Sequence, residues 1–331
     1  MKLVRTMKKI PLVSIVIPTL NEKKNIRRCL KSIVKQNYPK KKFEIIIVDN
    51  YSTDGTLDIA KKFPVKILMN RIKHAEVSKM IGFRKARGEY TIYLDADVEL
   101  VGRSWIQKML KPLLEDEEIV GSFTRKYAKK TDPPLERYYA FDPLQRDTIY
   151  QLFSPSLDSV LKEEKDGYCL LEYREGKIPP AGRCLYRKKK LLEAVKNYDM
   201  FLELDFLVLL TKKGLNKFAY VPSAGLYHHH APNLRTLLRK RKYNVQNVYL
   251  KTFEKKLYVW FDLKKKYDLV KIMLWIIYAN SFIPSLIVGI YKSFRHKDWA
   301  GLYEPFVNLL VTDTILSAFL LNRKTQLLLK R

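Results

Sequence analysis

Two aspartates separated by a single alanine can direct both carboxylates into one cavity. Asp95 and Asp97 follow Tyr90–Leu94, a short apolar run typical of a strand buried on both faces. One carboxylate can hold a divalent cation, and the other can reach the cation or a ribose. Such a cation neutralises charge that grows on a departing diphosphate. We therefore predict that Asp95 and Asp97 bind Mg²⁺ or Mn²⁺; the alternative is a pair of solvated loop acids.

A third carboxylate, Asp49, ends the buried run Glu44–Val48 and is followed by the turn-forming loop Asn50–Gly55. A carboxylate in this position can accept hydrogen bonds from a nucleobase N–H or a ribose hydroxyl. The alternative is an Asx-turn at Asp49, with Asp54 capping the next helix. Ligands of open α/β sheets bind at the carboxyl ends of strands, so we expect Asp49 to lie at the same sheet edge as the aspartate pair.

The elements that position these residues alternate between strand and helix. Asn21 can cap a first helix whose apolar residues between Ile26 and Val34 share one face. A further helix is predicted over residues 75–86. Strands are predicted at Val13–Pro18, Glu44–Val48, Val65–Met69 and Tyr90–Leu94, and two later ones directly after Arg183 and at 217–221. This alternation predicts an α/β domain with a mostly parallel sheet and helices on both faces.

Three segments taken together are more specific than any one motif. VSIVIPTLNEKKNI, EIIIVDNYSTDGT and GEYTIYLDADVEL, in this order over residues 13–100, resemble family-two glycosyltransferases of the GT-A fold. The resemblance implies transfer of a sugar from a nucleotide-diphosphate donor, with Asp95 and Asp97 contacting the metal and the diphosphate. It also implies a nucleotide pocket near Asp54, lined by Pro18, Thr19, Asn21, Glu22 and Asp49.

The chain departs from the family pattern ahead of the fourth strand. Family members often carry Arg-Asn before a glycine, whereas this chain has Lys79 and Met80 before Ile81 and Gly82. Lys79 replaces the charge of the arginine, and the hydrogen bonds of the asparagine are lost. We expect Lys79 to contribute to donor binding.

The resemblance also implies a catalytic base in LELDFLVLLTKKG, residues 202–214. The family's base is an acidic residue at the start of a helix upstream of a leucine-rich run, and Glu203 falls at that point. One carboxylate near the acceptor hydroxyl removes its proton as the anomeric carbon is attacked, which inverts that carbon in one step. Asp205 is the second candidate. Acids in a first helical turn also stabilise the helix dipole, so both could be structural.

Two further segments resemble parts of the family's active site, one before Glu203 and one after it. Pro179–Arg183 resembles the small-residue stretch that borders the acceptor site, with a plain turn as the alternative. Family members often place a histidine after the last strand, which implies that His228 or His229 lies near the diphosphate or metal. A polar loop is the alternative. The spacing of the histidines is not that of a zinc site.

The composition is strongly basic, with 63 Lys and Arg against 34 Asp and Glu and a net charge of +29. This charge favours polyanionic partners such as anionic lipid or phosphorylated substrates. The basic segment 238–250 can bind diphosphate, lie on anionic lipid or form a solvated helix face. No recognised nucleic-acid motif is present, so nucleic acid is not an expected partner. Three cysteines without metal-ligand spacing fit a reduced, cytoplasmic compartment.

The C-terminal residues differ from the rest in composition. Ile272–Ile290 carries no charge and Pro305–Leu321 carries only Asp313. Three alternatives follow: two spanning helices, re-entrant or interfacial helices, or a buried soluble pair. Basic residues flank both segments, which fits the positive-inside rule imperfectly for a spanning hairpin. The predicted domains are a catalytic domain (1–230), a basic helical connector (231–262) and a membrane-associated helical region (263–331).

These features predict an inverting, metal-dependent glycosyltransferase that is membrane-associated, with its catalytic domain in the cytoplasm. The expected partners are a nucleotide-sugar donor, a lipid-linked or membrane-proximal acceptor, and the membrane itself. A polyprenyl-phosphate glycosyl synthase is one alternative, and its phosphate acceptor would require no base. A catalytically silent membrane-surface binding protein is another, and retention of Asp95, Asp97 and Glu203 argues against it.

Overall fold

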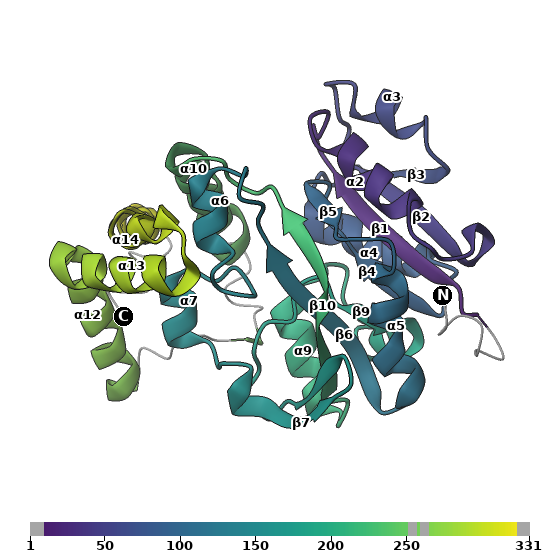
Figure 1. The fold of residues 1–331 in the computed structure, drawn as a ribbon. Coiled ribbons are helices and arrows are strands. Elements are labelled where there is room, and N and C mark those ends of the chain that lie inside the picture. Colours follow the sequence, from purple (N-terminus) through teal and green to yellow (C-terminus); the bar gives the residue numbers. More distant parts are fainter. Residues whose placement is uncertain (1–9, 251–256, 259–264, 323–331) are drawn as a thin grey trace. The chain divides into compact units, whose positions relative to one another are not determined.

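The computed structural model describes residues 10–250, 257–258 and 265–322 (Figure 1). The chain divides into two compact units: residues 1–127 with 155–228, and residues 128–154 with 229–331. Residues 128–154, predicted as part of the catalytic domain, therefore group with the C-terminal helices. Part of the predicted basic connector, 251–256 and 259–262, lies outside the described residues.

The first unit contains a mixed sheet with the strand order β3-β2-β1-β4-β9-β6-β10-β8-β7, and β5 pairs with β10. The strands are β1 (Val13–Thr19), β2 (Phe43–Asp49), β3 (Val65–Met69), β4 (Tyr90–Tyr93), β5 (Val98–Leu100), β6 (Ile119–Tyr127), β7 (Leu161–Lys165), β8 (Tyr168–Glu172), β9 (Leu185–Arg187) and β10 (Lys217–His228). The run from β3 to β4 is parallel. Beyond β4, β6 and β10 pair in parallel, and the other strand pairs of the described residues are antiparallel. The expectation of a mostly parallel sheet was therefore wrong. The strand character of β7 and β8 was not recognised, and β9, which was predicted as a strand, pairs antiparallel with both of its neighbours.

Helices cover both faces of this sheet (Figure 1). The helices of the first unit are α2 (Ile26–Val34), α3 (Thr56–Ala60), α4 (Ala75–Lys85), α5 (Trp105–Glu115), α8 (Lys188–Ala194), α9 (Glu203–Lys212) and the short η1 (Lys40–Lys42) and η2 (Asp158–Val160). Successive residues of β1 point to opposite faces. Ile15 and Ile17 join the core cluster that includes α2. Val16 meets Gly82 of α4, where a Cβ atom would overlap it. Gly82 thus allows α4 to pack closely on the sheet.

The second unit is helical where the structure describes it. It contains α6 (Pro134–Tyr139), α7 (Thr148–Phe153), α10 (Leu234–Asn244), the π-helical turn η3 (Val245–Tyr249), α12 (Lys266–Asn280), α13 (Phe282–His296), η5 (Trp299–Tyr303) and α14 (Glu304–Leu320). Leu135, Leu237, Val307 and Val311 are among the buried residues that join α6, α10 and α14 in one apolar cluster. The unit is therefore built from helices that lie far apart in the sequence.

The uncharged C-terminal segment does not form one continuous helix. It breaks at Ser281, which has extended backbone angles and separates α12 from α13. Within the described residues, no single helix has the length and apolar composition to cross a bilayer. Within the part of the chain that the structure describes, α12 and α13 together reach that length and composition, and the pair is bent by 81°.

Candidate active site

Three parallel strands bring their carboxyl ends to one edge of the sheet. Thr19 at the end of β1 lies opposite Asp49 at the end of β2. β4 pairs with β1 on its other side, and the backbone N–H of Leu94 donates to Val16 O at 2.8 Å. The loop that carries Asp95 therefore starts at the same edge as Asp49, as the ligand-binding rule for open sheets predicts.

Asp49 is fully buried and holds the loops after β1 and β2 together. Its Oδ2 accepts hydrogen bonds from Thr19 Oγ1 at 2.7 Å and from Ser52 Oγ at 2.6 Å. Its Oδ1 accepts one from the backbone N–H of Ser52 at 2.7 Å. This backbone bond reaches the third residue after Asp49 and closes a turn one residue longer than the Asx-turn considered for it. A carboxylate has about four acceptor positions, so this turn still leaves capacity for a ligand.

Asn21 connects the same two loops. Its backbone N–H donates to Ser52 Oγ, and its side-chain Oδ1 accepts from the backbone N–H of Thr53, both at 2.9 Å. Asn21 has φ 55°, a left-handed conformation that asparagine tolerates better than most residues. The turn after Pro18 is thus shaped by its backbone as well as by its side chains.

Asp54 and Glu22 fix the outer part of this region. Asp54 Oδ2 accepts from the backbone N–H of Lys23, and its Oδ1 accepts from that of Thr56, each at 3.0 Å. The backbone N–H of Glu22 donates to Thr56 Oγ1 at 2.8 Å. Asp54 therefore anchors the start of α3, which is the structural role considered for it.

A buried amide network beside these loops was not anticipated from the sequence. Asn70 Nδ2 donates to Asn50 Oδ1 at 2.9 Å, and Ser78 Oγ donates to the same oxygen at 3.0 Å. Asn50 Nδ2 in turn donates to Thr19 O at 3.1 Å. The network connects the ends of β1, β2 and β3 with α4. This is the helix in which the chain lacks the asparagine that family members often carry. The only available signal was an asparagine directly after each of two strands.

Lys79 is buried on α4 and forms an ion pair with Glu76, with Nζ 2.9 Å from Oε2. The ammonium group also lies 4.2 Å from the centre of the Tyr93 ring. Burial alone lowers the pKa of Lys79, but Glu76 and Asp95 outweigh it and raise the pKa above its usual value. Lys79 therefore carries a positive charge that is held in place and interacts electrostatically with Asp95.

Arg183 supplies a second buried cation next to the aspartate pair. Its guanidinium forms an ion pair with Asp95 and lies 3.2 Å from His228 Nε2. Burial raises the pKa of Asp95, but Arg183, Lys79 and His228 together lower it well below its usual value. Arg183 has φ 57°, so the stretch Pro179–Arg183 ends in a left-handed turn. Sequence analysis placed this stretch beside the acceptor and missed the contact of its arginine with Asp95.

Asp97 and His228 meet because β5 and β10 are antiparallel neighbours. His228 lies opposite Val98, the residue after Asp97, and its Nε2 is 3.3 Å from Asp97 Oδ1. Burial and Arg183 lower the pKa of His228 below its usual value, although Asp97 opposes them. A neutral imidazole beside a buried carboxylate is a donor set that fits a divalent cation, and one imidazole ligand favours Mn²⁺ over Mg²⁺.

Glu203 is the first residue of α9 and accepts a hydrogen bond from the hydroxyl of Tyr93, at the end of β4. A Cβ atom on Gly182 would lie 3.8 Å from Glu203 Oε1, so the loop with Pro179–Arg183 borders this carboxylate. Asp205, the other candidate base, is 4% exposed, whereas Glu203 is only partly buried. Of the two, Glu203 is the carboxylate more accessible to a substrate.

His229 belongs to the second unit. Its Nδ1 lies 3.5 Å from Glu136 Oε2 on α6. His228 is thus the histidine that the first unit places beside Asp97, in keeping with the alternation of side chains along an extended segment.

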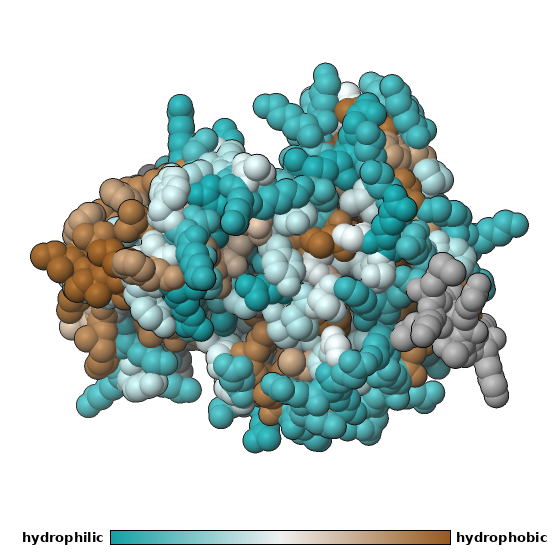
Figure 2. Space-filling model, viewed as in Figure 1, coloured by the Kyte–Doolittle hydropathy of each residue, from teal (hydrophilic) through white to brown (hydrophobic). Residues whose placement is uncertain are grey.

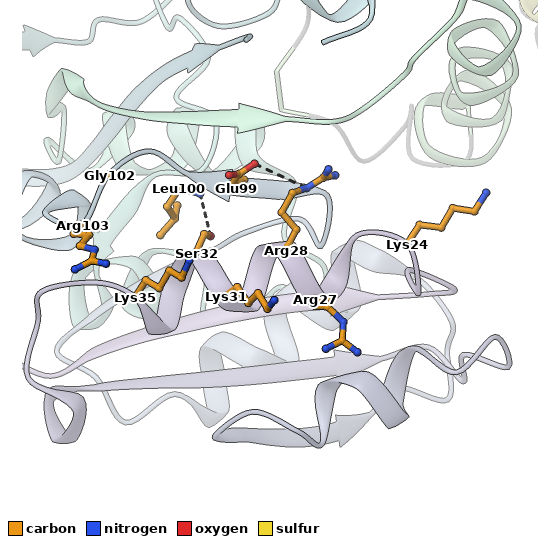
Figure 3. A pocket seen from close by; sticks show the side chains of 10 residues that line it. All are labelled: Lys24, Arg27, Arg28, Lys31, Ser32, Lys35, Glu99, Leu100, Gly102 and Arg103. Atoms are coloured by element: carbon orange, nitrogen blue, oxygen red, sulfur yellow. Dashed lines mark hydrogen bonds and ion pairs between the residues drawn. The ribbon is translucent and has the colours of Figure 1, made fainter. Parts of the chain in front are cut away.

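A basic groove of about 500 Å³ lies on the first unit between α2 and the loop around β5 (Figure 3). It is lined by Lys24, Arg27, Arg28, Lys31, Ser32, Lys35, Glu99, Leu100, Gly102 and Arg103. Figure 3 shows Arg28 directed toward Glu99, with Nε 4.0 Å from Oε2. The groove contains none of the predicted site residues. Its charge attracts anions but offers no pair of carboxylates for catalysis.

The sheet, with carboxylates at the ends of its parallel strands, has the architecture of a GT-A-like α/β protein. Residues 14–164 match the sequence model of glycosyl transferase family 2. This part of the chain is therefore a family-two glycosyltransferase domain, as its motifs predicted.

Curated relatives resemble mainly this N-terminal part. Glycosyltransferase AglE of Haloferax volcanii is 28% identical over 143 residues, which are 41% of this chain and 47% of the relative. A dolichyl N-acetyl-α-D-glucosaminyl phosphate 3-β-D-2,3-diacetamido-2,3-dideoxy-β-D-glucuronosyltransferase of Methanococcus voltae is 37% identical over 91 residues, 25% of this chain and 28% of that protein. The chain thus spans less than half the length of these relatives.

A solved structure is similar over nearly the whole chain. The mannosyltransferase PcManGT from Pyrobaculum calidifontis, in complex with GDP-Man and Mn²⁺, matches with a TM-score of 0.50 and 16% identity. The match covers 98% of this chain and 79% of the mannosyltransferase. At this identity the likeness concerns the fold.

Proposed function

We propose that this chain transfers a sugar from a nucleotide-diphosphate donor to an acceptor hydroxyl with inversion of the anomeric carbon. The observation that carries the proposal is the grouping, in one unit, of Asp95, Asp97 and His228 with the carboxylate of Glu203. Asp95, Glu203 and Asp97 each raise the pKa of Arg183 above its usual value. This supports their common location around that guanidinium. Family membership provides the reaction class.

The donor nucleotide would occupy the edge formed by the loops after β1 and β2. Asp49 retains acceptor capacity for a nucleobase or ribose, and the turn at Asn21 is held in a fixed shape. The diphosphate is anionic, and the buried cations Lys79 and Arg183 lie beside Asp95. Fixed cations at this position stabilise charge on the leaving diphosphate without reorganisation during the reaction.

Asp97 and His228 would hold a divalent cation, with Asp95 as a further carboxylate. Such a cation, when bound, supplies Lewis-acid stabilisation of the leaving diphosphate. The low pKa of His228 keeps its imidazole neutral and thus able to act as a ligand. In the mannosyltransferase that shares the fold, the complex contains Mn²⁺.

Glu203 would remove the proton of the acceptor hydroxyl, with the hydroxyl oxygen attacking opposite to the diphosphate. Tyr93 donates a hydrogen bond to Glu203 and thereby holds the carboxylate in one orientation. Gly182 lies beside Glu203 and leaves the space that a side chain would fill, so an acceptor can approach the carboxylate.

We further propose a lipid-linked or membrane-proximal acceptor and a membrane-associated enzyme with a cytoplasmic catalytic domain. The transferase of Methanococcus voltae is named for a dolichyl phosphate-linked acceptor. The exposed apolar residues of the second unit and the net charge of +29 are compatible with an anionic bilayer.

Two measurements test the reaction and separate it from its alternatives. Thermal-shift assays of the full chain with nucleotide diphosphates and sugar nucleotides should show stabilisation that depends on Mn²⁺. With a radiolabelled donor and lipid acceptors, the product should be a glycan extended on its lipid and resistant to mild acid at the new linkage. An acid-labile monosaccharide phospholipid would indicate a polyprenyl-phosphate synthase instead. Binding of a donor without its hydrolysis or transfer would indicate a silent binding protein.

A further inference from the structure

The helices α12, α13 and α14 bury several polar side chains, and α12 and α13 expose most of their large apolar side chains. The buried polar residues are Ser285, Glu304, Asn308 and Thr312. The exposed apolar residues of the same helices are Tyr267, Leu269, Val270, Met273, Leu274, Ile277, Phe282, Ile283, Ile287, Ile290, Tyr291, Phe294, Phe306 and Leu320. Helices that face water show the reverse pattern. A polar interior with small residues at helix contacts is typical of helices surrounded by lipid.

The polar interior is organised around one carboxylate. Glu304 is 0% exposed and accepts hydrogen bonds from Tyr138 Oη at 2.7 Å, Thr148 Oγ1 at 2.8 Å and Asn308 Nδ2 at 3.1 Å. Lys292 of α13 forms an ion pair with it. The inside of these helices is therefore fixed by specific contacts. Their apolar face is consequently the outer one.

The exposed apolar residues form a continuous face. On α12 they include Val270, Met273, Leu274 and Ile277, which are spaced as one side of a helix. On α13 the same spacing relates Ile283, 70% exposed, to Ile287, Ile290 and Phe294. Figure 2 shows this apolar surface over α12 and α13, concentrated where the two helices meet. A continuous apolar surface of this kind marks a contact.

Side chains at the break donate to carbonyl groups near the end of α12. Asn280 Nδ2 donates to Ile276 O (2.9 Å), Ser281 Oγ to Ile277 O (2.7 Å) and Ser285 Oγ to Tyr278 O (3.2 Å). A broken helix is tolerated in hydrocarbon only when the freed backbone groups find such partners. The bend is therefore compatible with a position inside a lipid leaflet.

Positive charge lies at both ends of the bent pair and none lies at the bend. Lys265, Lys266 and Lys271 precede the uncharged stretch from Ile272 to Tyr291, and Arg295 and Lys297 follow it. A pair that crossed the bilayer would put its two basic ends on opposite sides, against the positive-inside rule. A pair that turns back puts both ends among the anionic headgroups of one leaflet.

We propose that α12 and α13 form a re-entrant element that enters one leaflet of an anionic bilayer and returns to the same surface, with Ser281–Ile283 deepest. Each helix has 15 residues, which corresponds to about 22 Å. With the 81° bend placed symmetrically, the pair reaches about 15 Å, half of a hydrocarbon core of about 30 Å. The partner is thus the acyl region of a single leaflet. This inference goes beyond the proposed transfer and does not depend on it.

Depth and sidedness test the proposal in the full-length chain bound to vesicles of phosphatidylcholine and phosphatidylglycerol. A fluorescent nitrobenzoxadiazole group is attached to a single new cysteine at Tyr267, Ile283 or Phe294, with Cys169→Ser and with the buried Cys29 and Cys184 retained. Nitroxides near the acyl-chain ends should quench the Ile283 probe most. Dithionite added outside the vesicles should reduce the probes at both Tyr267 and Phe294. Protection of only one of these two probes would show a crossing, and equal shallow depth for all three probes would show a surface helix. Either result would overturn the proposal.

Charge substitutions provide a second test. Ile283→Asp and Ile287→Asp alter exposed side chains, so the fold should be kept while flotation with vesicles falls at least tenfold. Ile72→Asp in the first unit, 69% exposed, is the matched control and should float like the wild type. Unchanged flotation of both α13 variants would overturn the proposal. So would a vesicle-independent dimer in buffer that Ile283→Asp dissociates, because a second copy would then cover the face. The assay contains no sugar donor, so its failure would leave the proposed transfer intact.

Discussion

Asp97 and Glu203 have different surroundings, and these determine what their substitution should change. Asp97 is buried against the imidazole of His228, whereas Glu203 lies at a helix start beside a glycine. The first is suited to hold a cation, and the second is accessible to an acceptor. Their variants should therefore separate donor binding from turnover.

Asp97→Asn should remove a hard anionic ligand while keeping the size of the side chain. We expect transfer to fall by more than about 100-fold, since even outer-shell partners of a metal site contribute about 10–100-fold. The melting temperature should change little. Turnover and Mn²⁺-dependent donor binding measure the effect, with the exposed Asp58→Asn as the control. Normal turnover of Asp97→Asn with Mn²⁺ would refute the metal assignment.

Glu203→Gln should lower the turnover number by about 10²–10⁴-fold, which is the usual contribution of a general base. Donor affinity should be nearly unchanged, because Glu203 is assigned to the acceptor. Parallel measurement of transfer and of nucleotide binding separates the two effects, and the exposed Glu193→Gln is the control. Equal losses in both quantities would mean that Glu203 is structural. Unchanged turnover would favour Asp205 or a phosphate acceptor.

Sequence reasoning placed the acidic residues at the sheet edge because strand ends and turn formers are local signals. It did not find Arg183 as the partner of Asp95 or Tyr93 as the partner of Glu203. These contacts join residues 88 and 110 positions apart. Long-range pairing of this kind depends on the register of the whole sheet, which a local pattern does not encode.

At the level of elements, α13 depends on one close approach. A Cβ atom on Gly289 would lie 2.7 Å from the carbonyl oxygen of Gly301 in η5. The two glycines allow the backbones of α13 and η5 to touch, as small residues do at helix contacts in lipid. The apolar face of α13 points away from this contact.

Gly289→Leu should therefore destabilise the second unit by about 1–3 kcal/mol, the usual cost of overpacking. Ile290→Leu, on the exposed side of the same helix, should cost far less. Denaturation of the two variants in the same mild detergent measures the difference. Similar midpoints for both variants would show that α13 does not pack against η5 as described.

The parallel strands were predictable because they are continuous apolar runs, and helix α2 was predictable because its apolar residues repeat with helical spacing. β7 and β8 were not, because they are short and lie in a region rich in proline and charge. β10 extends to His228, beyond its predicted end at residue 221. Its pairing with β5 accounts for the added length, since antiparallel partners are not visible in a single strand's sequence.

On the scale of the whole molecule, the net charge of +29 should control encounter with a bilayer more than retention on it. Charge attracts the chain over a Debye length of about 10 Å at 0.1 M salt and about 3 Å at 1 M. Apolar burial is not screened in this way. The two contributions can be separated by the order in which salt and vesicles are added.

We expect high salt to slow binding to anionic vesicles when it is present from the start. Protein that has already bound should remain after a high-salt or carbonate wash. Stopped-flow binding and sedimentation after washing measure these two quantities. Release of bound protein by salt alone would show that surface charge, and not apolar insertion, accounts for the attachment.

The second unit is assembled from two stretches of chain, and this has a consequence for synthesis on the ribosome. Tyr138 and Glu304, which share a buried hydrogen bond, are 166 residues apart. At about 5–20 residues per second, α6 leaves the ribosome roughly 10–30 s before its partner in α14 exists. During that interval Tyr138 lacks its partner Glu304, and the apolar cluster that contains Leu135 lacks the residues of α14. A nascent chain that stalls before α14 would therefore present α6 to chaperones and proteases, even with its glycosyltransferase sheet already folded.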